Sequence, residues 1–142
     1  IDVRAASGAA VKVASSVTED RSGSSMTAGD SYFGLGMTAG ATPAPIGHYQ
    51  VFGVNGLANT VAASVIGSQA GATWATQAAG TPIDHGAGYK MTSVGTTPGG
   101  PTAITSAQWT MRIEPTLNST TALALTGNQA IDGRMTLTLM YL

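Results

Sequence analysis

In the first fourteen residues, IDVRAASGAAVKVA, large apolar and charged side chains occupy alternate positions. The large apolar residues Ile1, Val3, Val11 and Val13 hold odd positions, and all the charged residues hold even ones. Successive side chains of a β-strand point to opposite faces, so the pattern predicts an amphipathic strand over 1–14. At about 3.3 Å per residue it would span roughly 46 Å. A compact domain of this size is only about 37 Å across. The strand must therefore bend between two sheets or leave its own domain.

Turn-forming residues recur along the rest of the chain. Nineteen glycines and six prolines are spread over 142 residues, and they interrupt helices and central strands. The clearest turns are TAGATPAPIG at 38–47 and SVGTTPGGPT at 93–102. Short alternating or β-branched segments between turns predict an all-β fold. The expected strands lie near 1–14, 31–38, 48–54, 60–67, 88–94, 107–113, 121–126 and 134–142. A helix stays an alternative in the alanine-rich stretch 58–79.

Charge and cysteine content exclude several classes of protein. Charged residues make up 9% of the chain and the net charge is −1, which is not the basic footprint of a nucleic-acid-binding protein. There is no cysteine, so disulfides and thiolate metal sites are excluded. No apolar run approaches the roughly 18 residues of a membrane-spanning helix. A chain that starts at Ile1 is consistent with a removed signal peptide.

The sequence offers no coherent catalytic constellation. Asp84 and His85 are adjacent and His48 lies elsewhere, but no nucleophile motif of the form G-x-S-x-G accompanies them. Two histidines and scattered acids do not have the spacing of metal ligands. We therefore predict no enzyme activity, no catalytic residue, no metal and no cofactor. His85, in the turn-like segment TPIDHGAG, is interpreted as a solvated loop histidine.

Aromatic residues are the candidates for contact with a small ligand. Trp109 alternates with Met111 and Ile113, which predicts a place in the core. Trp74, in GATWATQ, lacks such patterning and is the candidate for an exposed aromatic. If a carbohydrate or another surface ligand binds, Trp74 with Tyr49 or Tyr89 would contact it.

The last nine residues, RMTLTLMYL, form a second alternating strand that begins just after Gly133. Together with the N-terminal pattern, this end resembles the subunits of chaperone–usher pili, above all the cysteine-free type with a long N-terminal extension. The resemblance implies an immunoglobulin-like antiparallel β-sandwich that lacks its final strand. The N-terminal extension of the next subunit would complete it, by donor-strand complementation.

The resemblance divides the chain into a donor-strand extension, residues 1–14, and a pilin domain, residues 15–142. The donor side chains would be Ile1, Val3, Ala5, Ala9, Val11 and Val13. The acceptor groove would be lined by Met135, Leu137, Leu139 and Tyr141. Many pilins have a glycine at an inward position of the extension, whereas here Gly8 has outward parity and Ser7 takes the inward place.

The function that follows is a structural subunit of an extracellular adhesive fibre, exported through the periplasm. Its partners would be copies of itself, a periplasmic chaperone and an outer-membrane usher during assembly, and a host-surface receptor; nucleic acid is not expected. Two alternatives stay open. One is a viral or phage capsid, tail or decoration protein with an N-terminal arm, and the other is a carbohydrate-binding β-sandwich.

Overall fold

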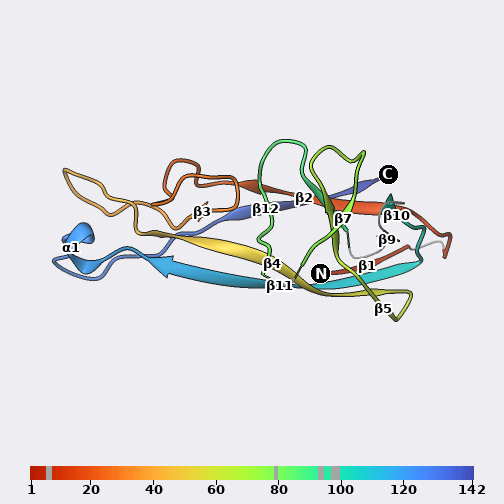
Figure 1. Ribbon diagram of the computed structural model, residues 1–142. Coiled ribbons are helices and arrows are strands. Elements are labelled where there is room, and N and C mark those ends of the chain that lie inside the picture. The colour runs from red at the N-terminus through yellow and green to blue at the C-terminus, as the bar shows by residue number, and fades with distance from the viewer. Residues whose placement is uncertain (6–7, 79, 93–94, 97–99) are drawn as a thin grey trace.

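The chain folds into two five-stranded antiparallel sheets that lie one over the other (Figure 1). The computed structural model describes residues 1–5, 8–78, 80–92, 95–96 and 100–142. The first sheet has the order β1–β11–β4–β3, with β5 also paired to β4, and the second has the order β12–β2–β8–β6–β7. The predicted all-β class is confirmed.

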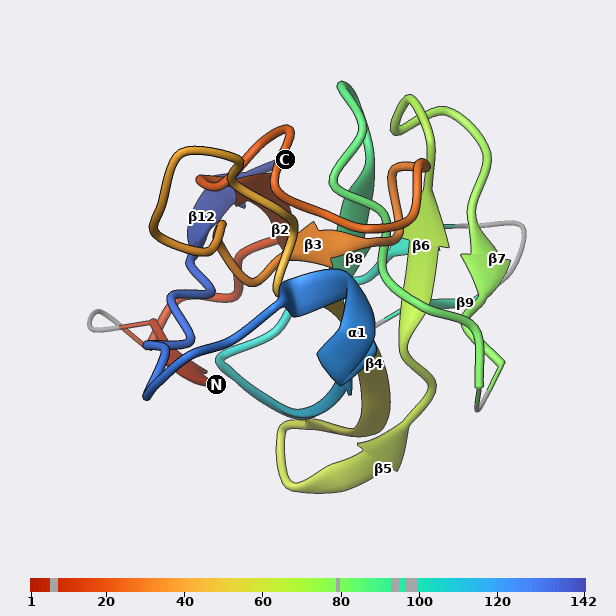
Figure 2. The same cartoon turned by 90° about the vertical axis from the view of Figure 1, so that its left-hand side faces the viewer.

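The first sheet is built on two long strands that form its centre. Its members are β1 (Asp2–Arg4), β11 (Ser106–Leu117), β4 (Gly47–Ala58), β3 (Phe33–Gly34) and β5 (Val61–Ala63). The second sheet consists of β12 (Met135–Tyr141), β2 (Val13–Glu19), β8 (Lys90–Thr92), β6 (Ile66–Ser68) and β7 (Ala75–Thr76). Two short strands, β9 (Gly95–Thr96) and β10 (Gly100–Pro101), pair with each other. In the view turned by 90°, the strands β12, β2, β8, β6 and β7 follow one another across the molecule, and β4 and β5 lie below them (Figure 2).

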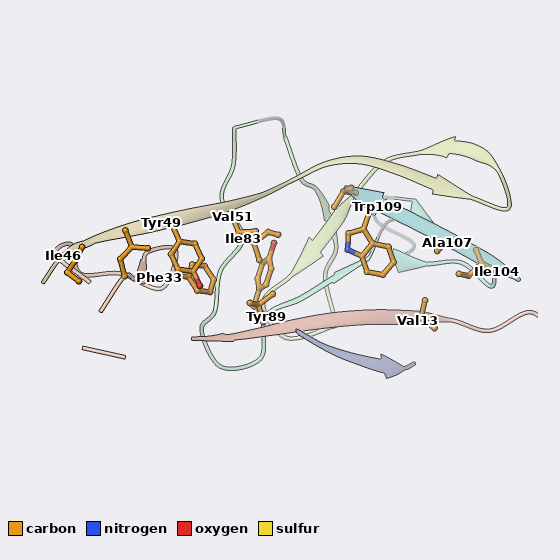
Figure 3. Packing of buried hydrophobic residues seen from close by; sticks show 13 residues of the cluster. Val13, Phe33, Ile46, Tyr49, Val51, Ile83, Tyr89, Ile104, Ala107 and Trp109 are labelled. Atoms are coloured by element: carbon orange, nitrogen blue, oxygen red, sulfur yellow. The ribbon is translucent and has the colours of Figure 1, made fainter. Parts of the chain in front are cut away.

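The main core runs lengthwise between the two sheets (Figure 3). Trp109 of β11 lies near its middle with 1% of its surface exposed, which confirms its predicted place. Phe33 and Tyr49 stack at 5.1 Å between ring centroids farther along the row. A smaller cluster of Ala14, Ile66 and Trp74, separate from the main core, has Met140 packed against it.

The N-terminal segment does not form the single strand predicted over 1–14. Residues 2–4 pair with β11 in the first sheet, and Val13 begins β2 in the second, so the chain bends between two sheets. Gly8 has a φ of +69°, a backbone conformation that an extended strand does not contain and that glycine adopts without steric cost. The predicted inward position of Ser7 lies outside the described residues.

Two further secondary-structure predictions fail for local reasons. Residues 121–126 were expected to form a strand, but Thr120–Leu123 form the helical turn α1, whose N-terminus is capped by Ser119 and whose end is set by Ala124 in a left-handed conformation. The alternative of a helix in 58–79 is wrong for the described residues, which contain β5, β6 and β7 instead. Asn59 and Thr60 both have positive φ and turn β4 tightly into β5.

No helix in the described part of the chain is both long enough and apolar enough to cross a membrane.

Candidate functional site

The edge of the first sheet is only partly covered. β1 pairs with β11 at Ser106–Gln108, and Ile1 and Trp109 exchange backbone hydrogen bonds of 2.9 and 3.0 Å. Beyond Trp109, β11 continues to Leu117 with β4 on one side. Among the described residues, no strand pairs with residues 111–117 on the other side. A free backbone edge of this kind can pair with another extended chain.

Pro115 is a residue type that fits a free strand edge. The backbone N–H and carbonyl of Trp109 are hydrogen-bonded to Ile1, on the side of β11 where β1 lies. In an antiparallel ladder every second residue directs its backbone groups to the same side. The backbone groups of Ile113 and the nitrogen of Pro115 therefore point to this side, which is open beyond β1. Proline lacks an N–H and is confined to such edge positions within sheets. It removes one donor from the free edge and leaves the carbonyl groups in place.

An apolar cleft of about 310 Å³ adjoins this free edge. Its lining comes from β11, β4, β12 and the loops beside them: Leu35, Tyr49, Ile113, Pro115, Ile131, Gly133 and Met135. Ile113 is 54% exposed, although it has the same parity along β11 as the buried Trp109. Ile131 is exposed as well. The free edge and this cleft together are called the docking groove below.

The predicted acceptor residues divide into two pairs. Met135 and Leu137 of β12 pack partly buried against the main core, whereas Leu139 and Tyr141 are 47% and 82% exposed. Leu137 and Tyr141 lie opposite Val17 and Val13 of β2, whose side chains lie in the main core, and Met135 and Leu139 have the same parity. β12 is the outer strand of its sheet. Only Met135 among the four lines the docking groove.

The predicted donor residues lie in three settings within their own chain. Val13 belongs to the core, and Val3 and Val11 pack against it while partly buried. Ala5 is half-buried, and Ile1 and Ala9 are exposed. Val11 forms an isolated bridge with Ile104 and is not part of a continuous strand.

The three aromatic residues predicted for ligand contact are all buried. The Tyr89 hydroxyl donates to Gln77 at 2.9 Å, and the Trp74 indole N–H donates to the Gly71 carbonyl at 3.2 Å. Tyr49 lies in the main core, but Trp74 belongs to the smaller cluster. The expectation that Trp74 is exposed is therefore wrong, and the three rings do not form an exposed platform on which a sugar could stack.

Burial changes the acid–base behaviour of two tyrosines. It raises the pKa of Tyr89 to about 12, with a further contribution from Asp84. Burial also raises the pKa of Tyr49 to about 12, and the negative charges of Glu19 and Asp20 add to that effect. Both hydroxyl groups therefore stay protonated throughout the physiological range.

Glu19 and His85 form a buried contact that the sequence did not predict. The Glu19 carboxylate accepts the Gly34 N–H at 2.5 Å and lies 3.6 Å from His85 Nε2. The side chains are only 7% and 17% exposed. His85 is thus an interior residue and not the solvated loop histidine predicted. Its only signal in the sequence was its place beside Asp84, because a pairing with Glu19 depends on the fold.

His48 predicts a loss of stability in acid. Its side chain is buried with Nδ1 lacking a hydrogen-bond partner, and burial lowers its pKa below 6.5. The unfolded chain therefore binds a proton more readily than the folded chain does. The stability that His48 contributes is present above pH 6.5 and is lost as pH falls through the folded-state pKa, by up to about 1.4 kcal/mol for each unit of lowering. Urea unfolding should show a larger loss between pH 7 and 5 for the wild type than for His48→Gln. Equal losses would contradict the prediction.

Comparisons with known proteins identify no relative. Neither a family model, nor a curated protein, nor a solved structure matches the chain significantly. Within the described ranges, no group of three or more histidine, cysteine, aspartate or glutamate side chains is placed to hold a metal ion. The docking groove combines an apolar lining with a free backbone edge.

Proposed function

We propose that the protein is a structural subunit of an extracellular fibre, in which an immunoglobulin-like β-sandwich is completed by the N-terminal strand of a neighbouring copy. The proposal rests on the partly covered edge of the first sheet. β1 covers only the first part of the twelve-residue strand β11, and an apolar cleft lies beside the remaining free edge. A chaperone and an usher would hold and order the subunits during export, as the resemblance to pilus subunits implies.

The segment before β2 is held in its own domain by few contacts. In β1, which is three residues long, only Val3 packs against the core. Val11 also packs there and bridges to Ile104, and Ile1 is hydrogen-bonded to Trp109. An identical segment from another copy can make the same kinds of contact, as in domain swapping, so the loss on release is offset on replacement.

The segment before β2 is long enough to pair with the whole free edge. Residues 1–12 precede β2, and β11 has twelve residues. In an antiparallel pair with full overlap, Ile1 lies opposite Leu117 and Val3 opposite Pro115. The odd residues of both strands then share the inner face, as Ile1 and Trp109 do within one chain. Gly8 can extend in this arrangement because glycine adopts both conformations.

Charge favours the same register. With full overlap, Arg4 lies opposite Glu114 on the outer face. A shift by two residues toward the register of β1 places Asp2 opposite Glu114 and Arg4 opposite Arg112. Like charges directly opposite each other are destabilising in an antiparallel pair. Full overlap therefore combines the longest ladder with an attractive pair.

Two full-length variants test the proposal. Val3→Asp should disable the donor and Ile113→Asp the acceptor, because each buries a carboxylate in the completed groove. Negative-stain micrographs of the wild type should show open fibres, and each variant alone should form none. A mixture of the two should give heterodimers in sedimentation and no fibres, because each supplies the half that the other lacks.

Val61→Asp is the matched control, since Val61 is 67% exposed on β5 and lies outside the groove. It should form fibres like the wild type. Fibres from Ile113→Asp would overturn the proposal. Closed shells from the wild type would favour a capsid protein instead.

A further inference from the structure

Glu19 connects the two parts of the chain that form one end of the docking groove. It is the last residue of β2 and the backbone partner of Met135, which lines the cleft. Its carboxylate accepts the Gly34 N–H, and Gly34 immediately precedes Leu35, which also lines the cleft. The Glu19 carboxylate and backbone therefore help to position two walls of the cleft, one at Leu35 and one at Met135.

His85 lies against the other oxygen of that carboxylate. Nε2 of His85 is buried without a hydrogen-bond partner, 3.6 Å from Glu19 Oε2. The ring meets Phe33 edge-on at 4.9 Å, and the backbone N–H donates to the Asp30 carbonyl at 2.8 Å. A separation of 3.6 Å is too long for a hydrogen bond. A protonated imidazole would present an N–H and a positive charge to the carboxylate from this position.

Several charged groups lie near this contact. Asp30 and Asp84 both approach Gly86, the residue after His85. Asp20 follows Glu19 in the chain, and the charges of both act on Tyr49, whose hydroxyl stays neutral. The charged side chains that these contacts place beside His85 and Gly86 are thus carboxylates, and the nearby cation Arg21 pairs with Asp132.

We propose that His85 is a proton-controlled brace of the docking groove. When the imidazole is protonated, it forms an ion pair with Glu19 and fixes the carboxylate that holds Gly34 and Leu35. When the imidazole is neutral, the carboxylate loses that partner and this end of the cleft loosens. Subunits would thus accept a strand more readily in mild acid. This consequence for assembly rests on the proposed function, but the brace itself can be measured in the isolated subunit.

Hydrogen exchange at the Gly34 amide measures the brace directly. The experiment uses full-length His48→Gln protein, because His48 is the backbone partner of Gly34 and titrates as well. The protection factor of the Gly34 amide, corrected for the intrinsic exchange rate, should fall roughly two- to fivefold between pH 5.5 and 7.5, as expected for loss of an ion pair. The amide of Val51, in the core of β4, serves as the internal reference.

Two substitutions at His85 decide the outcome. His85→Gln should abolish the pH dependence at Gly34, and His85→Lys, which keeps its charge, should give high protection at both pH values. No pH dependence in the parent protein, or the same dependence with His85→Gln, would overturn the brace. If the brace is found but Ile113→Asp still forms fibres, the proposed function fails and the brace stands.

Discussion

Trp109→Ala is expected to remove a large part of the stability of the fold. The indole is almost fully buried in the main core, and truncation leaves a cavity between the two sheets. Large-to-small substitutions of this kind cost about 3–5 kcal/mol, whereas whole domains are stable by only about 5–15 kcal/mol. For a chain of this length the melting temperature should fall by about 10–20 °C. Calorimetry at pH 7 measures both quantities.

Two controls bear on the cause of this loss. Trp109→Phe should be milder than the alanine variant, since it fills much of the space and removes an indole N–H that has no partner in the structure. Ile113→Ala, at an exposed position of the same parity in the same strand, should change stability by well under half as much. Equal losses from Ile113→Ala and Trp109→Ala would contradict the assigned core.

Gly47→Ala is expected to separate β4 from β11 at the end where the docking groove lies. A Cβ at this position would overlap the Thr116 carbonyl oxygen and lie 3.0 Å from the Leu117 Cα. Both are backbone atoms of the paired strand, so they cannot move aside as a flexible side chain would. We expect a loss of about 1–3 kcal/mol in the free energy of unfolding, and faster hydrogen exchange at Leu117 than in the wild type.

Gly127→Ala is the matched control for Gly47→Ala. A Cβ at Gly127 meets nothing within 4 Å, and its φ does not lie in the left-handed region. This variant should leave stability unchanged or raise it slightly, because alanine lowers the entropy of the unfolded chain. If both alanine variants are neutral, the close approach of β4 and β11 at Gly47 is wrong.

The local sequence pattern predicted strands correctly where apolar and polar residues alternate without interruption. The strand expected at 134–142 is present as β12, and the one expected at 107–113 lies within β11. The core position of Trp109 followed from the same period of two residues. Pattern failed at 1–14, because the parity of the side chains does not reveal that Gly8 bends the backbone. It failed at 121–126, where a capping serine outweighed the β-forming character of the segment.

The candidate site could be predicted only in part. Met135, one of the four residues predicted for an acceptor groove, is among the residues that line the cleft, whereas Leu35, Ile113 and Pro115 were not foreseen. Their segments are far apart along the chain, and nothing in any one of them indicates the others. The predicted acceptor positions Leu139 and Tyr141 have the expected parity but are exposed. Parity fixes the face of a strand to which a side chain points, and not what lies above that face.

The sequence by itself therefore determined the class of fold, the faces of the longest strands and the absence of cysteine chemistry. These properties depend on residues close together in the chain. Tertiary structure alone decided that β1 covers only the first part of β11, that the cleft lies beside the uncovered part, and that Glu19 meets His85. Each of these depends on contacts between residues distant in sequence. Such contacts are set by how two twisted sheets pack and by where their strands end, which no local pattern encodes.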